Sequence, residues 1–277
     1  SVGILLIIMN KEFSESSGDS SHRVHTINNH SINPDGDFVL YWMTASRRYH
    51  YNSALEHSIS LSIKLNKPLL VVEAVSIRHI WSSDRILTFF AQGIIDNTRI
   101  FQSHNLTYIP WVETHKQTGN GLLRKLSRSS CAVVIDDFPT YLPRDVMRQA
   151  SKFCKVRLDA VDSNGILPIN WADRAFPSAY SFRKYMQKNL LSALATIPEF
   201  DPMENVTKDL LLPNTYVENL FLNAGSPITP YEWLWRVAQG GEIGIEACAP
   251  LDIDHAVPPV NSKRGGRFEA CLLYTSP

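Results

Sequence analysis

Residues 39–52 are Val39-Leu40-Tyr41-Trp42-Met43, an apolar run, followed at once by the polar stretch Thr44-Ala45-Ser46-Arg47-Arg48-Tyr49-His50-Tyr51-Asn52. An apolar run of this length that leads into a polar turn and then a helical pattern is typical of a buried parallel strand. Doubly wound α/β folds hold their ligands at the carboxyl edge of such strands. The stretch therefore predicts an α/β domain whose functional edge begins at Thr44.

Apolar strand patterns and helical patterns continue to alternate along the chain after this stretch. Strands are expected at 38–43, 68–75, 106–112, 131–135 and 156–161, and helices at 47–65, 84–103, 121–129 and 143–153. Strands and helices that alternate at this spacing indicate a doubly wound, mostly parallel five-stranded sheet covered on both faces. Asp84 is the expected N-terminal cap of its helix. A further helix is expected at 179–194, and a helical turn at 231–238.

Four segments are expected along the chain. They are a polar N-terminal lead-in over 1–36, the α/β domain over 37–197, a linker with the start of a further domain over 198–270, and a foreign tail over 271–277. The natural start is expected at Met9, and the tail indicates a truncated reading frame. After Pro198, prolines and short apolar pieces replace the sheet pattern. Apolar residues there, such as Phe221 and Trp235, would be partly exposed without a further packing partner.

Composition limits the classes of function. Lysine plus arginine and aspartate plus glutamate each total 27, so no global positive field would attract nucleic acid. The four cysteines are far apart and form neither a CxxC pair nor a disulfide ladder, which indicates a reducing cytoplasm. The apolar run from Val2 to Met9 is too short to cross a bilayer and lacks preceding basic residues, so no membrane role is expected.

The motifs of common nucleotide-binding and hydrolytic enzymes are absent from the sequence. It contains no Gly-x-Gly-x-x-Gly, no P-loop and no Gly-x-Ser-x-Gly elbow. His22, His25 and His30 have no carboxylate or cysteine arranged to complete a metal site. We therefore predict no catalytic residue and no metal ligand. A ligand at the turn after Met43 would be held by side chains rather than by a backbone phosphate cradle.

Polar residues gather where the fourth and fifth predicted strands end. Asp136-Asp137-Phe138 ends the fourth strand, and Asp162-Ser163-Asn164-Gly165 follows the fifth. Because parallel strands share one carboxyl edge, these carboxylates are expected to converge near Ser46-Arg47-Arg48 and form a polar pocket. The structural alternative is that Asp136 or Asp137 caps the next helix and that 162–165 is a tight turn.

Several blocks resemble, in order, the N-terminal domain of the DNA photolyase/cryptochrome family, most closely the class II photolyases of cyclobutane pyrimidine dimers. The blocks are Val39 to Met43 with Arg47-Arg48 and Asn52-Ser53-Ala54-Leu55, then Lys67 to Val72, Ala132 to Pro139, Val161 to Pro168, and Ala179 to Lys184. The later segment Ile253 to Val260, with Arg264-Gly265-Gly266, is similar to the linker toward the helical flavin domain of that family. Ordered blocks across residues 37–200 are far more specific than any one of them.

The resemblance implies a light-dependent function. In this family a reduced flavin (FAD) in a C-terminal helical domain passes an electron to a pyrimidine dimer flipped out of DNA, and the dimer splits, which is a carbon–carbon lyase reaction. The N-terminal domain can hold an antenna chromophore, a deazaflavin, a folate or a flavin. The chain would then be a fragment of a deoxyribodipyrimidine photolyase. Its partners would be damaged DNA and its own helical domain, which this chain lacks.

The residues predicted to bind an antenna chromophore are Trp42, Met43, Arg47, Arg48, Asp136, Asp137 and Phe138. The arginines would pair with an anionic tail, and Phe138 would stack on the ring. Two other classes stay open at this point. One is a cryptochrome-like blue-light photoreceptor, which shares this domain. The other is a stand-alone nucleotide-binding α/β protein, although the phosphate loops of such proteins are missing here.

Overall fold

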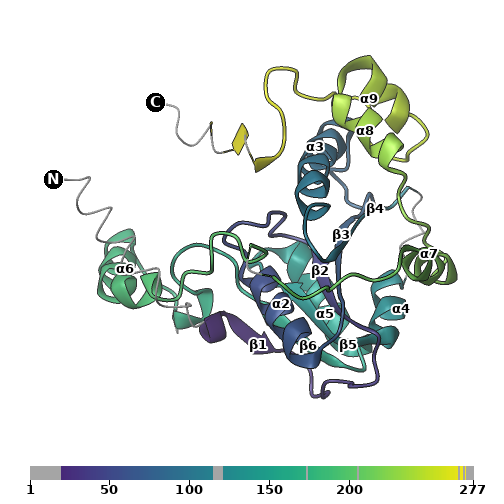
Figure 1. The fold of residues 1–277 in the computed structure, drawn as a ribbon. Coiled ribbons are helices and arrows are strands. Elements are labelled where there is room, and N and C mark those ends of the chain that lie inside the picture. Colours follow the sequence, from purple (N-terminus) through teal and green to yellow (C-terminus); the bar gives the residue numbers. More distant parts are fainter. Residues whose placement is uncertain are drawn as a thin grey trace.

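The computed structural model describes residues 20–114, 121–172, 174–204, 206–267, 269, 270 and 272 of the 277-residue chain. The predicted start at Met9 and nearly all of the predicted foreign tail lie outside the described residues. The described part is built on one β-sheet with helices on both faces (Figure 1). This arrangement confirms the predicted mostly parallel α/β class.

In the described part of the chain, six strands form the sheet in the order β1-β6-β5-β2-β3-β4. Their bounds are β1 Val24–Thr26, β2 Phe38–Met43, β3 Leu69–Val75, β4 Thr107–Val112, β5 Ser130–Asp136 and β6 Arg157–Val161. Neighbours among β2 to β6 are parallel, whereas β1 pairs antiparallel with β6 and places Val24 opposite Val161. The prediction of five strands missed β1, because its two half-buried residues and one exposed residue lie in a polar segment and show no apolar pattern.

Successive residues of β2 face opposite sides of the sheet, as the pleat requires. Leu40 and Trp42 pack in a core with Leu126 of α4 (Leu122–Ser129) and with α5 (Tyr141–Phe153). Tyr41 and Met43 pack in a second core with α2 (Ser53–Leu65). The strand is therefore buried on both faces, which is why its sequence is an uninterrupted apolar run.

Two helix starts differ from the predictions. α2 begins at Ser53 and not at residue 47, because the side chain of Asn52 caps the helix and accepts the Leu55 backbone N–H at 3.0 Å. Tyr51, just before the cap, has φ 47°, a left-handed conformation that a helix cannot contain. α3 (Asp84–Phe101) begins where expected, but its cap is the hydroxyl of Ser83 rather than Asp84.

The segment after residue 197 packs on the α/β domain. It contains α7 (Asn214–Asn223), α8 (Tyr231–Gln239) and α9 (Gly241–Cys248), and α8 lies along α3 (Figure 1). Phe221 of α7 is fully buried in the α4-side core, so the expectation that it would be exposed is wrong. Trp235 of α8 is 44% exposed. The domain boundary at residue 197 stays a prediction.

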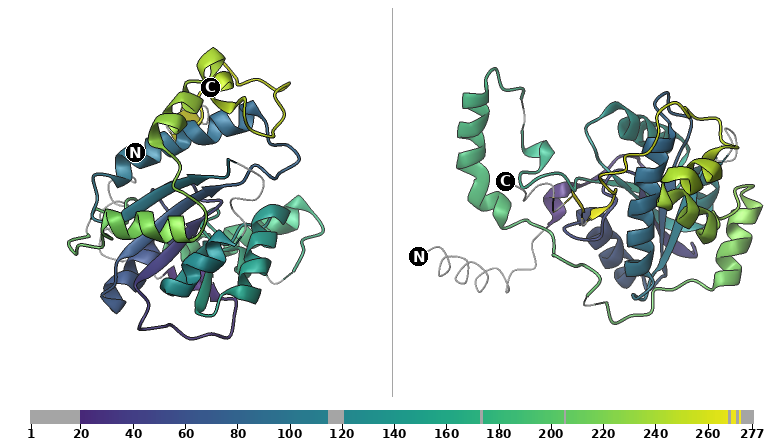
Figure 2. Two further views of the ribbon diagram at one scale, coloured as in Figure 1. Left: turned by 90° about the vertical axis from the view of Figure 1, so that its right-hand side faces the viewer. Right: turned by 90° about the horizontal axis from the view of Figure 1, so that it is seen from above.

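One helix stands away from the sheet. α6 (Ala179–Leu194) projects from the body of the molecule (Figure 2), and Ala193 is its buried residue. Two short 3₁₀ helices, η1 (Ser20–Arg23) and η2 (Ile169–Trp171), lie near the β1 edge. Within the described chain, no helix combines the length and apolar character needed to cross a bilayer.

Candidate functional site

The candidate site lies at the carboxyl edge of the sheet, where the strand order reverses. β3 lies on one side of β2, and β5 lies on the other. The connection after β3 leads to β4 and the connection after β5 leads to β6, so the two connections leave in opposite directions. A reversal of this kind opens a crevice beyond the strand ends. The turn over residues 44–52 occupies this place, as the sequence predicted.

Asp136, at the end of β5, holds this turn together. Its Oδ2 accepts the backbone N–H groups of Thr44 and Ala45, both at 2.8 Å, and of Ser46 at 3.1 Å. Its Oδ1 accepts the hydroxyl of Tyr41 at 2.8 Å. Burial and this carboxylate raise the pKa of Tyr41 well above its ordinary value, so the phenol remains a hydrogen-bond donor. Asp136 thus reaches the turn as predicted, but its oxygens are already occupied by the protein itself.

The other predicted strand-end residues have separate surroundings. Asp137 faces a different hollow, with its Oδ2 3.4 Å from Nε2 of His25, and burial raises the pKa of its carboxyl group. Phe138 is half-buried. Asp162 accepts the backbone N–H groups of Asn164 and Ile169 at 2.8 and 2.7 Å and so shapes its own loop. The carboxylates of the two loops therefore do not share one pocket. Neither Asp136 nor Asp137 caps α5, whose cap position is Thr140.

A cavity of about 630 Å³, the edge cavity, opens beyond the ends of β2 and β3. This volume lies within the usual range for sites that bind small organic molecules. Three parts of the chain form its walls: the turn, with the end of β3; the face of α3; and the segment near residue 267. The lining residues are Ala45, Arg47, Arg48, Glu73, Phe89, Phe90, Gly93, Gly266, Arg267 and Ala270.

A buried ion pair forms part of the wall of the edge cavity. Nη1 of Arg47 lies 3.2 Å from Oε1 of Glu73, a side chain that is 1% exposed. The other oxygen of Glu73 accepts hydrogen bonds from Asn97 at 2.8 Å and from the Tyr108 hydroxyl at 2.6 Å. The guanidinium of Arg47 lies over the ring of Phe90, 4.8 Å from its centroid. Because Glu73 neutralises Arg47, this arginine presents a fixed planar surface rather than an unpaired charge.

Of the seven predicted binding residues, Arg47 and Arg48 line the edge cavity. Arg48 donates to the carbonyls of His50, Tyr51 and Ser163. Trp42 is 7% exposed and Met43 fully buried, and they pack into the cores on opposite faces of the sheet. Their position at the strand end suggested a site, but the alternation of the strand directs both side chains into the cores.

Sequence reasoning missed two walls of the edge cavity, namely α3 and the C-terminal segment that docks on it. Arg264 holds this segment through two hydrogen bonds to Asp96, at 2.7 and 2.8 Å. The backbone N–H of Gly265 donates to Gln92 at 2.5 Å. A Cβ atom at Gly265 would lie 2.4 Å from the carbonyl oxygen of Phe89, so the close approach requires glycine. The Arg-Gly-Gly motif was visible in the sequence, but its partner helix was not.

Glu56, in the first turn of α2, supports a prediction on pH dependence. Burial raises the pKa of its carboxyl group from 4.5 to about 7. The folded protein therefore binds this proton more tightly than the unfolded chain, and the resulting stabilisation is lost as the pH rises from about 4.5 through about 7. Between pH 5 and pH 8, we expect the free energy of unfolding to fall about 1–2 kcal/mol more in the wild type than in Glu56→Gln, after a discount for partial exposure. Urea denaturation of both proteins measures this difference, and equal pH slopes would contradict it.

The fold is that of a doubly wound α/β domain, and the edge cavity lies at the carboxyl edge of its sheet, beyond β2 and β3. No protein-family model matches the sequence. A deoxyribodipyrimidine photo-lyase from Methanothermobacter thermautotrophicus is 26% identical over 171 residues, which are 61% of this chain and 38% of that protein. Over these residues the chain is similar to the N-terminal α/β domain of the photolyase/cryptochrome family.

One solved photolyase structure shares this fold. An archaeal photolyase from Sulfolobus tokodaii, determined with two FAD molecules, matches with a TM-score of 0.54 at 11% identity, over 87% of this chain and 46% of the other. A match to a cryptochrome from Synechocystis covers 65% of this chain and 40% of the cryptochrome, at 15% identity and with a TM-score of 0.43. The chain spans less than half the length of these relatives.

Proposed function

We propose that this chain is the light-collecting domain of a deoxyribodipyrimidine photolyase of class II, and that the edge cavity holds its antenna chromophore. The observation that carries the proposal is the character of the cavity walls. Phe89, Phe90 and the guanidinium plane of Arg47 offer flat surfaces at the ligand-binding edge of the fold. Fused-ring chromophores such as flavins, deazaflavins and folates stack on surfaces of this kind.

Arginines from two separate elements would hold the charged end of such a ligand. Arg48 comes from the turn, and Arg267 comes from the docked C-terminal segment, where it donates to the Tyr49 hydroxyl at 2.7 Å. An anionic tail between them would be recognised by charge-assisted hydrogen bonds. The transfer of excitation energy depends on distance and orientation and requires no acid or base. The domain therefore acts by holding the ring in a fixed place.

The repair reaction is proposed for the whole protein that carries this domain. FAD, bound in a helical domain, would supply an electron to a pyrimidine dimer, and damaged DNA would be the substrate. The identity to the Methanothermobacter photo-lyase supports this proposal. Asp137 and Phe138 stay predicted chromophore contacts, although neither lines the edge cavity.

Blocking the edge cavity tests the proposal. Gly93 lies on the cavity wall in the middle of α3, and a Cβ atom there would make an ordinary contact of 3.7 Å with Gly266. We expect Gly93→Leu to fill the cavity and to weaken chromophore binding by at least about tenfold, since stacked ring contacts contribute about 0.5–1.5 kcal/mol each. The measurement is fluorescence and absorption titration of the purified chain with FAD, FMN, a deazaflavin and a folate.

Gly93→Ala is the matched control. Both substitutions replace a helical glycine by a better helix former, so both proteins are expected to fold at least as stably as the wild type. The small methyl group of alanine leaves the cavity open, and binding should persist. Arg47→Ala should weaken binding as well, because it removes a planar surface. The proposal fails if none of the four chromophores binds at micromolar concentration, or if the leucine and alanine variants bind equally well.

A further inference from the structure

A second cavity, of about 380 Å³, lies on the β6 side of the turn, and we call it the α2 cavity. The start of α2, the loop after β6 and the residues that follow α6 form its walls. Its polar lining includes Arg23, Arg48, Ser53 and Ser163. The chromophore proposal makes no use of this space, although Arg48 borders both cavities.

Ser53, the first residue of α2, carries a polar group that nothing in the described chain satisfies. Its side chain is 0% exposed, and its Oγ has no hydrogen-bond partner among the described residues. The next two residues are satisfied, because the Ala54 N–H donates to Ser163 Oγ at 3.2 Å and the Leu55 N–H to Asn52 at 3.0 Å. A buried hydroxyl without a partner is unfavourable and calls for a specific explanation. A ligand in the cavity that Ser53 lines would supply the missing partner.

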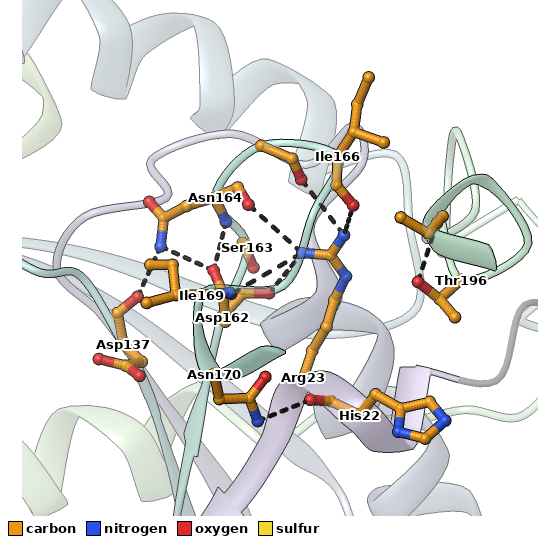
Figure 3. Close-up of polar contacts among 12 residues, drawn as sticks. His22, Arg23, Asp137, Asp162, Ser163, Asn164, Ile166, Ile169, Asn170 and Thr196 are labelled. Carbon is orange, nitrogen blue, oxygen red and sulfur yellow. Dashed lines mark hydrogen bonds and ion pairs between the residues drawn. The ribbon is translucent and has the colours of Figure 1, made fainter. Parts of the chain in front are cut away.

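Two arginines bring positive charge to the same cavity. Arg23 is 1% exposed, and its two terminal nitrogens face the backbone carbonyls of the loop over residues 162–166 (Figure 3). Its Nε has no partner among the described residues. Arg48 uses Nε and Nη2 for backbone carbonyls, and its Nη1, which carries two hydrogens, has no hydrogen-bond partner among the described residues. The N-terminus of α2 adds the positive end of a helix dipole.

The nearby carboxyl groups offset only part of this charge. Asp162 lies 4.0 Å from Nη1 of Arg23 and balances that guanidinium, so the net positive charge comes from Arg48. Glu56, one turn into α2, is held partly protonated at neutral pH because burial raises its pKa to about 7. The positive character of the cavity therefore persists around pH 7, which favours an anion.

We propose that the α2 cavity binds an oxyanion of the phosphate class, either free phosphate or the phosphate group of a small phosphomonoester. The hydroxyl of Ser53, Nη1 of Arg48 and Nε of Arg23 have no hydrogen-bond partner among the described residues, and all three residues line this cavity. A tetrahedral anion with several acceptor oxygens can accept from several such donors, and guanidinium groups are well suited to it. The volume also leaves room for a small organic group beside the phosphate.

The test compares two serines of one helix. Ser53 and Ser62 both lie in α2, both are 0% exposed, and both carry an Oγ without a partner among the described residues. Ser53 lines the α2 cavity, whereas Ser62 is not among its lining residues. We expect Ser53→Ala to weaken phosphate binding by about tenfold and Ser62→Ala to leave it unchanged, since a hydrogen bond to a charged group typically contributes a factor of this size.

Binding is measured on the full chain at pH 7.5, by the shift of the melting temperature and by calorimetric titration with sodium phosphate. Sodium chloride at equal ionic strength is the reference. A rise in melting temperature specific to phosphate, reduced in Ser53→Ala alone, supports the site. The absence of a phosphate-specific rise in the wild type, or equal binding by the two alanine variants, overturns the proposal. Chromophore titrations of the same variants keep the two proposals distinguishable.

A parallel titration with adenosine monophosphate identifies the source of the anion. Tighter binding than that of inorganic phosphate indicates a phosphomonoester ligand, and equal affinity indicates free phosphate. Either result supports an oxyanion site, provided that Ser53→Ala weakens it.

Discussion

Asp136→Asn is expected to lower the free energy of unfolding by about 3 kcal/mol. The carboxylate is 2% exposed and accepts three backbone N–H groups of the turn together with the hydroxyl of Tyr41. An amide offers one acceptor oxygen in place of two and carries no charge. One orientation turns its NH₂ group toward the N–H groups of the turn, and the other turns it toward Tyr41. Both leave weakened or unmade hydrogen bonds in a buried place.

The matched control for this variant is Asp137→Asn, at the next residue. Asp137 is half-buried and interacts with the partly exposed His25, so its replacement should change the free energy of unfolding by no more than about 0.5–1 kcal/mol. Urea denaturation of both variants measures the difference. Because the turn carries Arg47 and Arg48, Asp136→Asn should also lose chromophore binding. A loss of stability as small as that of the control would show that the turn does not depend on Asp136.

Arg23→Met is expected to lower the free energy of unfolding by about 3–5 kcal/mol. Methionine replaces the length and apolar part of the side chain, but not the guanidinium. The carbonyls of Asp162, Asn164, Gly165 and Ile166 would lose their donor, and the carboxylate of Asp162 would lose its nearest positive charge. Burial already lowers the pKa of Arg23, which indicates how fully the loop has replaced water around it.

Arg148→Met is the matched control for Arg23→Met. Arg148 pairs with Asp145 on α5, but its side chain is 69% exposed, so the change should alter stability by less than about 0.5 kcal/mol. Chemical denaturation gives the free energies. Hydrogen exchange over residues 162–169 should become faster in Arg23→Met and stay unchanged in Arg148→Met. Equal effects of the two variants would exclude a structural role for the buried arginine.

The five long strands could be predicted from the sequence because each one is buried, or nearly buried, on both faces. β2 and β5 are continuous apolar runs in which all residues are buried, and such runs need no knowledge of the partner strand. β1 could not be predicted in this way. Its three residues have little apolar character. Their place beside β6 is set by strand pairing and by Arg23, which precedes β1 and donates to the carbonyl of Ile166, a residue far away in the sequence.

The residues of the candidate site also fall into those that the sequence could predict and those that it could not. Arg47 and Arg48 could be predicted, because they directly follow a buried strand and so must lie at the carboxyl edge of the sheet. Trp42 and Met43 were chosen by the same reasoning, and it failed for them because the pleat directs them into the cores. Phe90 and Arg267 could not be found, since the docking of a distant segment on α3 brings them together.

By itself the sequence determined the class of the fold, the place of the turn at the carboxyl edge of the sheet and the resemblance to a known family, because these depend on local patterns and on ordered blocks of residues along the chain. Only the tertiary structure decided which polar groups hold the turn through hydrogen bonds and which line a cavity without a partner among the described residues. Asp136 and Ser53 show the difference, since one has all its partners and the other has none among the described residues. The physical reason is that hydrogen-bond satisfaction and burial arise from contacts between residues far apart in sequence, which no local pattern encodes.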